Sequence, residues 1–111
     1  MFGRIRSTTP SGLRGMAGVT VLDVREPAEW RAGHIDGSVH IPLAQLGQRL
    51  GELDPAVPLV AVCRSGQRSA QVTAALVRNG YDATNLRGGL KAWARAGLPL
   101  SGADGTPGSV I

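Results

Sequence analysis

Short apolar runs alternate along the chain with segments that have helical periodicity. Residues 59–62 form an uninterrupted apolar run between Pro58 and a polar turn, a pattern typical of a strand buried on both faces. Further strands are predicted within residues 4–6, 19–24, 39–41 and 81–86. Because helical segments separate these strands, the pattern predicts an α/β fold in which helices cover both faces of a central, mostly parallel five-stranded sheet.

Apolar spacing and terminal glycines or prolines mark the predicted helices. After the buried strand, Val72, Ala75 and Leu76 share one helical face, and Gly80 supplies the left-handed residue that ends this helix. Leucines spaced three or four residues apart predict a core-facing helical stripe: Leu43, Leu46, Leu50 and Leu53. Shorter helical segments are expected at residues 9–14, after Glu26, and at residues 90–96, where Trp93 faces the core.

The only cysteine, Cys63, lies where the buried strand ends and the next helix begins. Backbone N–H groups in a tight loop that enters a helix point at the centre of the loop, and the helix dipole adds positive charge there. A thiolate in this place has a pKa below its ordinary value of about 8.5, and Arg64 and Arg68 favour the thiolate as well. Gly66 can adopt a positive φ that lets the loop curl, and nearby serines supply hydroxyls.

A lone cysteine after an apolar run also has a simpler interpretation, as a small buried hydrophobic residue. The neighbouring residues argue against it, since two arginines, a glycine and two serines follow Cys63 within six positions. Cations and hydroxyls of this kind need solvent or partners. We therefore interpret Cys63 as a nucleophile.

Asp23 lies near the C-terminal end of the strand at residues 19–24 and Arg25 directly follows it, at the edge where open α/β sheets bind ligands. They could assist catalysis directly, or they could form a buried ion pair that braces the cysteine loop. We favour the ion pair, because a free carboxylate would repel a nearby thiolate. His34, in a glycine-bounded turn, is interpreted as a hydrogen-bonded turn residue rather than a general base.

Composition narrows the class of protein. The chain has 111 residues and 42% hydrophobic content, which fits one domain over residues 1–100. Residues 101–111 are rich in Gly, Ser and Pro and are predicted to be a disordered tail. The net charge of +4 is dispersed, so neither nucleic acid nor a membrane is expected as a partner. No metal-ligand spacing, leader or long apolar run is found, and a cytoplasmic setting without metal or cofactor is expected.

Four ordered motifs within residues 19–100 resemble those of the rhodanese (thiosulfate sulfurtransferase) family. They are L-D-V-R-E-P-A-E-W at residues 22–30, G-H-I-D-G-S at 33–38, C-R-S-G-Q-R-S at 63–69, and G-G-L-K-A-W at 88–93 followed by G-L-P at 97–99. The resemblance implies a flattened three-layer α/β domain whose Cys63 carries a transferable sulfane sulfur as a persulfide. The implied substrate-binding residues are Arg64, Ser65, Gly66, Gln67, Arg68 and Ser69.

The implied reaction is a ping-pong transfer from a small anionic donor such as thiosulfate to an external acceptor, either cyanide or a thiol, which a protein can also carry. Two alternatives stay open at this point. One is a non-catalytic sulfur-carrier or regulatory module with the same fold. The other is a phosphatase, although only four residues lie between Cys63 and Arg68, one fewer than in the related phosphatase loop.

Overall fold

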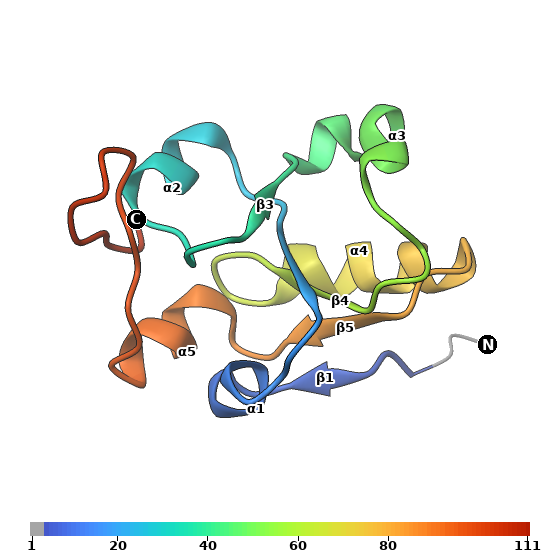
Figure 1. Ribbon diagram of the computed structural model, residues 1–111, viewed down its shortest axis with the longest axis horizontal. Helices are drawn as coiled ribbons and strands as arrows, with labels where there is room; N and C mark the ends of the chain where they lie inside the picture. The colour runs from blue at the N-terminus through green and yellow to red at the C-terminus, as the bar shows by residue number, and fades with distance from the viewer. Residues whose placement is uncertain (1–3) are drawn as a thin grey trace.

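Five parallel strands form the central layer of the structure, a computed structural model that describes residues 4–111 (Figure 1). Residues 1–3, which we assigned to the start of the domain, lie outside this range. The strands are β1 (Ser7–Thr8), β2 (Thr20–Asp23), β3 (Val39–His40), β4 (Leu59–Val62) and β5 (Ala83–Leu86). Their order is β1-β5-β4-β2-β3, and the pairings are parallel, which confirms the predicted α/β fold.

Strand β4 lies at the middle of the sheet and carries the chain into the cysteine loop. Its four residues are all buried, as expected for a strand covered on both faces. The register places Asp23 of β2 opposite Val62, the residue before Cys63, and Asn85 of β5 opposite Ala61. The carboxyl ends of three neighbouring strands therefore meet at one edge, where the sheet presents Cys63.

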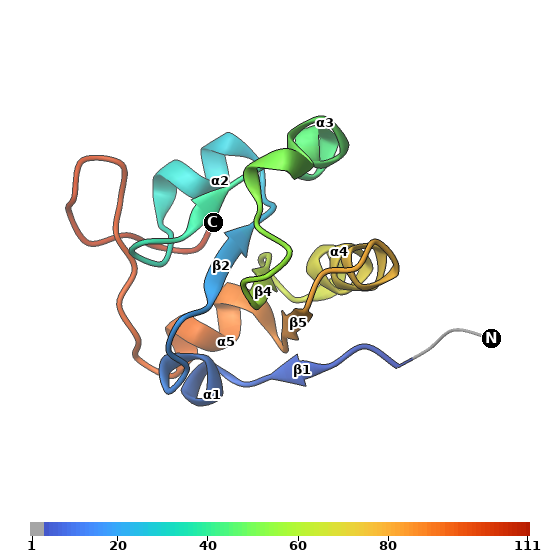
Figure 2. The same cartoon turned by 45° about the vertical axis from the view of Figure 1, so that its right-hand side comes forward.

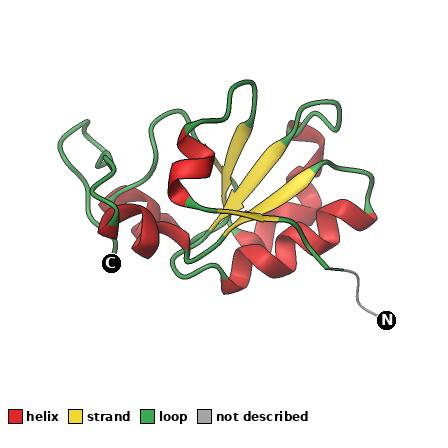
Figure 3. Ribbon diagram, turned by 90° about the horizontal axis from the view of Figure 1, so that it is seen from below, coloured by secondary structure: helices red, strands yellow, loops and turns green. Residues whose placement is uncertain are grey.

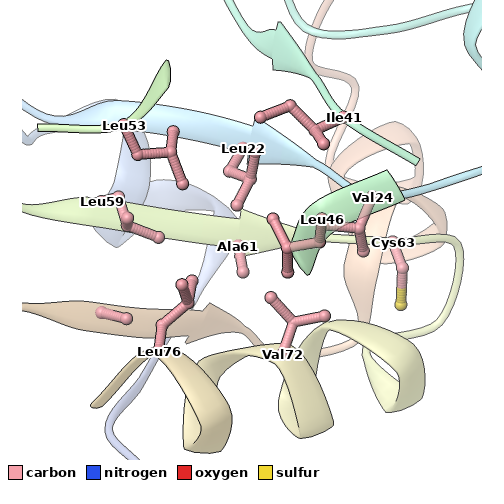
Figure 4. Packing of buried hydrophobic residues seen from close by; sticks show 11 residues of the cluster. Leu22, Val24, Ile41, Leu46, Leu53, Leu59, Ala61, Cys63, Val72 and Leu76 are labelled. Atoms are coloured by element: carbon pink, nitrogen blue, oxygen red, sulfur yellow. The ribbon is translucent and has the colours of Figure 1, made fainter. Parts of the chain in front are cut away.

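Helices cover both faces of the sheet (Figures 2 and 3). On one face, α3 (Leu46–Arg49) and α4 (Gln67–Arg78) contribute Leu46, Val72 and Leu76 to an apolar cluster with Leu22 and Ala61, which Figure 4 shows from close by. On the other face, α1 (Pro10–Arg14) and α5 (Gly89–Arg95) contribute to a second cluster through Leu13, Leu90 and Trp93. Trp93 is buried, as predicted.

Capping residues in the sequence predicted where the short helices begin, but the sequence did not predict that 3₁₀ turns would flank one of them. Thr9 caps α1 by accepting a hydrogen bond from Gly12 N, and α2 (Pro27–Ala32) begins with Pro27 after a reciprocal Glu26–Glu29 capping box. The expected leucine stripe is interrupted, because 3₁₀ turns at Leu43–Gln45 and Leu50–Glu52 flank α3 and shift the helical phase. Leu43 is consequently exposed rather than in the core.

Residues 101–111 fold back against α2, which differs from the disordered tail that we predicted. Ser101 pairs with His34 through two backbone hydrogen bonds, and Ser109 N donates to Ala32 O at 2.8 Å. Val110 packs against the second apolar cluster. The Gly, Ser and Pro content suggested disorder. It could not reveal the contacts that order this segment, because they are made with residues about 70 positions earlier in the chain. Within residues 4–111, no helix is both long and apolar enough to cross a membrane.

Docking of residues 101–111 depends on close approach at Gly108. A Cβ atom at this position would lie 2.6 Å from Gly33 Cα and 2.9 Å from Ala32 O. We expect Gly108→Val to displace the segment and to lower its local opening free energy by about 1–3 kcal/mol. The lost contacts are the hydrogen bonds from Gly108 N to Leu100 O and from Ser109 N to Ala32 O, and the packing of Val110. Hydrogen exchange at Ser109 would then be faster, while exchange in α4 would not change.

Ala103→Val is the matched control, because Ala103 is exposed in the same segment. Equal exchange rates in the wild type and in Gly108→Val would show that residues 101–111 are not docked in solution.

Candidate active site

The Cys63 sulfur lies at the end of β4 and points toward the first turn of α4 (Figure 4). Its residue is fully buried. Sγ accepts hydrogen bonds from Gly66 N at 3.1 Å and from Ser69 N at 3.3 Å, and Ser69 Oγ also lies 3.3 Å away. The sulfur is thus enclosed by inward-facing polar groups on one side, although its other side contacts the apolar cluster.

Two glycines give the loop this shape. Gly66 has φ 96°, a left-handed conformation that turns the chain into α4 and directs its own N–H at the sulfur. Gly89 lies so close to the loop that a Cβ there would be 2.5 Å from the carbonyl oxygens of Cys63 and Arg64. Those carbonyls accept hydrogen bonds from Leu90 N and Lys91 N. The start of α5 therefore holds the loop carbonyls away from the sulfur and leaves the amides facing it.

Burial and hydrogen bonding act on the Cys63 thiol in opposite directions. Burial alone raises the pKa of Cys63, because a thiolate loses its hydration. Hydrogen bonds from the Ser69 hydroxyl and from the backbone amides of Ser69, Gly66 and Ser65 more than offset burial, so the pKa lies below the ordinary value. The N-terminus of α4 adds a favourable dipole.

Arg68 forms a forked ion pair with Glu29 of α2. Its two terminal nitrogens donate to the two carboxylate oxygens at 2.9 Å, and Glu29 also accepts from Glu26 N. These hydrogen bonds raise the pKa of Arg68 and lower that of Glu29. The structure thus matches Arg68, one of the implied substrate-binding residues, with a carboxylate that offsets part of its charge. Its role in substrate binding stays a prediction, and the ion pair joins the cysteine loop to α2.

Arg64, Ser65 and Gln67 are exposed at the rim of the loop. The Arg64 Nε donates to the carbonyl oxygen of Ile111 at 3.0 Å, so the docked residues 101–111 reach the residue next to the nucleophile. Among residues 4–111, no Asp or Glu side chain forms an ion pair with Arg64. The exposed guanidinium lies at the entrance to the site, with the Ile111 backbone oxygen as its hydrogen-bond partner.

Asp23 and Arg25 form the expected buried ion pair. Both side chains have zero exposure, and Arg25 Nε and Nη2 donate to the Asp23 carboxylate at 2.8–3.1 Å. Arg25 Nη2 also donates to Gly33 O at 2.7 Å. The pair braces the connection between β2 and α2 directly, and the cysteine loop only through the pairing of β2 with β4.

His34 is hydrogen-bonded, as predicted, through Nδ1 and the Trp30 carbonyl. Its ring also stacks on Trp30 at 3.6 Å, and His40 stacks on Trp30 at 4.7 Å. His40 Nε2 contacts the Arg25 carbonyl. His40 thereby connects the three stacked rings to the Arg25 backbone, and we assign His34 no part in the chemistry of Cys63.

Two residues beside the site carried no signal that we used. Glu29 was part of the motif at residues 22–30 but had no assigned role, and its partner Arg68 lies 39 positions away. Asn85 is buried in β5 and contacts both Gly66 O and Ser69 Oγ. The predicted strand at residues 81–86 also contains Asp82 and Thr84, so the polarity of Asn85 alone did not indicate a specific partner.

The sheet and the loop together define a parallel α/β domain that holds a thiol within a ring of amides at a helix N-terminus. A sequence profile described as Rhodanese-like domain matches residues 11–96. The chain is 41% identical over 88 residues to a sulfurtransferase of Allochromatium vinosum, a match covering 78% of this chain and 82% of that protein. It is 35% identical over 107 residues to the thiosulfate sulfurtransferase GlpE of Pseudomonas fluorescens, covering 96% of each.

Solved structures agree with these sequence matches. A rhodanese-related protein from Thermoplasma volcanium superposes with a TM-score of 0.82 at 32% identity, over 86% of this chain and 96% of that one. The chain therefore belongs to the rhodanese-like domain family, which confirms the resemblance found in the sequence.

The lowered pKa of Cys63 can be measured in the protein without any substrate. Titration of thiolate ultraviolet absorbance, with Cys63→Ser subtracted, should give a midpoint below that of the urea-unfolded chain. At pH values between the folded-state pKa and the ordinary pKa of the thiol, the unfolded chain binds more protons than the folded chain. The free energy of unfolding therefore rises with pH across this range. This increment should be missing in Cys63→Ser. A midpoint equal to or above that of the unfolded chain would contradict the amide cradle.

Proposed function

We propose that this protein is a sulfurtransferase that carries a sulfane sulfur on Cys63. The observation that supports this most directly is the hydrogen bonding of Sγ by the amides of Gly66 and Ser69, which stabilises a thiolate nucleophile. The named sulfurtransferases among the relatives support the same class of reaction.

In the first step, the Cys63 thiolate attacks the outer sulfur of a donor such as thiosulfate. A bond forms between Sγ and that sulfur, the donor's sulfur–sulfur bond breaks, and its electron pair leaves with sulfite. In the second step, a nucleophilic acceptor bonds to the sulfane sulfur, and the Cys63–sulfur bond breaks with its electron pair returning to Sγ. Cyanide accepts the sulfur as thiocyanate, and a thiol accepts it as a persulfide.

The entrance to the site favours anionic donors. Arg64 is exposed beside the nucleophile, and it is the candidate group for the negative charge of the donor and of the departing sulfite. Since Cys63 is the only cysteine, no second thiol of the chain can take the sulfur, and the acceptor comes from outside. We place this chemistry in the cytoplasm, where small thiols and protein thiols are reduced and can serve as acceptors.

A phosphatase requires the terminal arginine of the loop to bind a phosphoryl group. Here Arg68 is occupied by the two oxygens of Glu29, which favours sulfur transfer. A purely structural role for the domain is less compatible with the lowered pKa of Cys63. The remaining alternative, a non-catalytic sulfur carrier, differs from the enzyme only in the second step.

We expect thiosulfate to convert the protein to a form heavier by one sulfur atom, about 32 Da, because the thiolate is the attacking group. Intact mass spectrometry detects this increment, and added cyanide should remove it while thiocyanate appears. In Cys63→Ser both the mass increment and turnover should be lost.

Each outcome separates the alternatives. Thiocyanate production by Cys63→Ser would exclude Cys63 as the sulfur carrier. A stable increment that neither cyanide nor thiols remove would support the carrier module, and hydrolysis of an aryl phosphate would support the phosphatase.

Replacing Arg64 tests the donor-binding role of its charge. Arg64→Gln should raise KM for thiosulfate about threefold to tenfold, since an exposed charge at a binding site contributes about 1 kcal/mol. Steady-state thiocyanate formation measures this effect. The matched control is Arg78→Gln, which removes the same charge at the exposed end of α4. Equal effects of both substitutions would show that the whole protein field, rather than Arg64, attracts the donor.

A further inference from the structure

A buried amide side chain connects the two groups that define the sulfur cradle. Asn85 is 6% exposed and lies on β5 behind the cysteine loop. Its Nδ2 donates to Gly66 O at 3.2 Å, and its Oδ1 accepts from Ser69 Oγ at 2.6 Å. Because Gly66 O can only accept, the nitrogen of the amide must face Gly66, and the oxygen must face Ser69.

Asn85 Oδ1 and Cys63 Sγ compete as acceptors for the single hydroxyl proton of Ser69. Ser69 Oγ lies 2.6 Å from Asn85 Oδ1 and 3.3 Å from Cys63 Sγ, yet a serine hydroxyl has a single hydrogen. When the hydrogen points at Asn85, only a lone pair of Ser69 Oγ faces the sulfur, which suits a thiol that donates its own S–H. When the sulfur is a thiolate, the same hydroxyl stabilises it only by turning away from Asn85.

We propose that Asn85 is a positioning residue that controls the Ser69 proton, holding it while Sγ is uncharged and releasing it to Sγ when negative charge develops there. The short distance to Asn85 Oδ1 is at the strong end of the range for O–H···O hydrogen bonds. The Nδ2 contact with Gly66 fixes the amide, so the oxygen cannot follow the hydroxyl when it turns.

The consequence for sulfur transfer rests on the proposed function. In the persulfide, the negative charge lies on the outer sulfur and Sγ is neutral, so Ser69 bonds to Asn85. When an acceptor removes the outer sulfur, the electron pair returns to Sγ, and the Ser69 hydroxyl rotates toward it. No proton leaves Ser69 at any step. The Ser69 hydroxyl donates a hydrogen bond to the departing thiolate as negative charge develops on Sγ.

The experiment is a double-mutant cycle on the pKa of Cys63, measured by thiolate absorbance without any sulfur donor. The four proteins are the wild type, Ser69→Ala, Asn85→Leu and the double variant. Leucine has nearly the shape of asparagine but no acceptor. The loss of the Gly66 contact is common to both Asn85→Leu proteins and cancels in the cycle.

The four proteins share the same charged groups on the elements around Cys63. These groups are Arg64, Arg68 with Glu29, the Asp23–Arg25 pair and Lys91. If Ser69→Ala changes the pKa of Cys63 by different amounts with Asn and with Leu at position 85, the difference therefore reports on the Ser69 hydroxyl proton.

With Asn85 present, Ser69→Ala should raise the pKa of Cys63 by well under one pH unit, because the hydroxyl gives up its hydrogen bond to Asn85 when it turns to stabilise the thiolate. With Leu at position 85, nothing competes for the hydroxyl proton, and removing it should raise the pKa by about one pH unit, a tenfold change in the dissociation constant. Equal changes in the two backgrounds, or a larger change in the presence of Asn85, would overturn the proposal.

A second measurement covers the case in which Asn85→Leu does not fold. The carboxamide ¹³C and ¹⁵N resonances of Asn85 should move as Cys63 ionises in the wild type, and this movement should shrink at least twofold in Ser69→Ala. Movement of the same size in both proteins would reflect only the charge of the sulfur, and it would overturn the proposal. Both measurements concern the free thiol, so their result is independent of whether sulfur transfer itself is observed.

Discussion

The hydrogen bonds from backbone amides to the Cys63 sulfur are the interaction on which the site depends. A fully buried thiol would ordinarily be an inert hydrophobic group, and burial opposes its ionisation. The Ser69 hydroxyl and the amides of Ser69 and Gly66 together reverse this balance, and the rest of the local structure points these groups inward. Contacts from α5 draw the loop carbonyls outward, and the parallel sheet brings β4 to the same edge as its neighbours.

The cradle is connected to elements on both sides of β4. On one side, the Arg68–Glu29 pair joins the first turn of α4 to α2, and α2 in turn contacts residues 101–111. On the other side, Asn85 joins β5 to the loop. Movement of either neighbour would therefore change the orientation of the amides. A site built from backbone groups is rigid only when the surrounding elements are held in place. Here the side chains of Glu29 on α2 and Asn85 on β5 hold the cysteine loop.

The features that the sequence predicted correctly are those decided by local chemistry. The apolar run of β4, the helical turn at residues 9–14, the amide-lined loop at Cys63 and the Asp23–Arg25 pair all involve residues a few positions apart. The features that it did not predict depend on distant partners. Arg68 looked like a free cation because Glu29 lies on another helix, and residues 101–111 looked disordered because their hydrogen bonds are made with residues 31–34. Leu43 was misplaced because a 3₁₀ turn, with three residues per turn, carries it off the stripe.

The burial of Sγ also constrains the reactions that the cradle can support. Gly66 N and Ser69 N each lie within 3.3 Å of Sγ, so the amides enclose the sulfur closely on this side. The proposed reaction fits this enclosure, because a sulfane sulfur is a single divalent atom that projects from its donor and needs less space beside the amides than a phosphoryl or acyl centre with three or four substituents. On that proposal, the hydrogen bonds that lower the pKa of Cys63 also favour the transfer of a single atom.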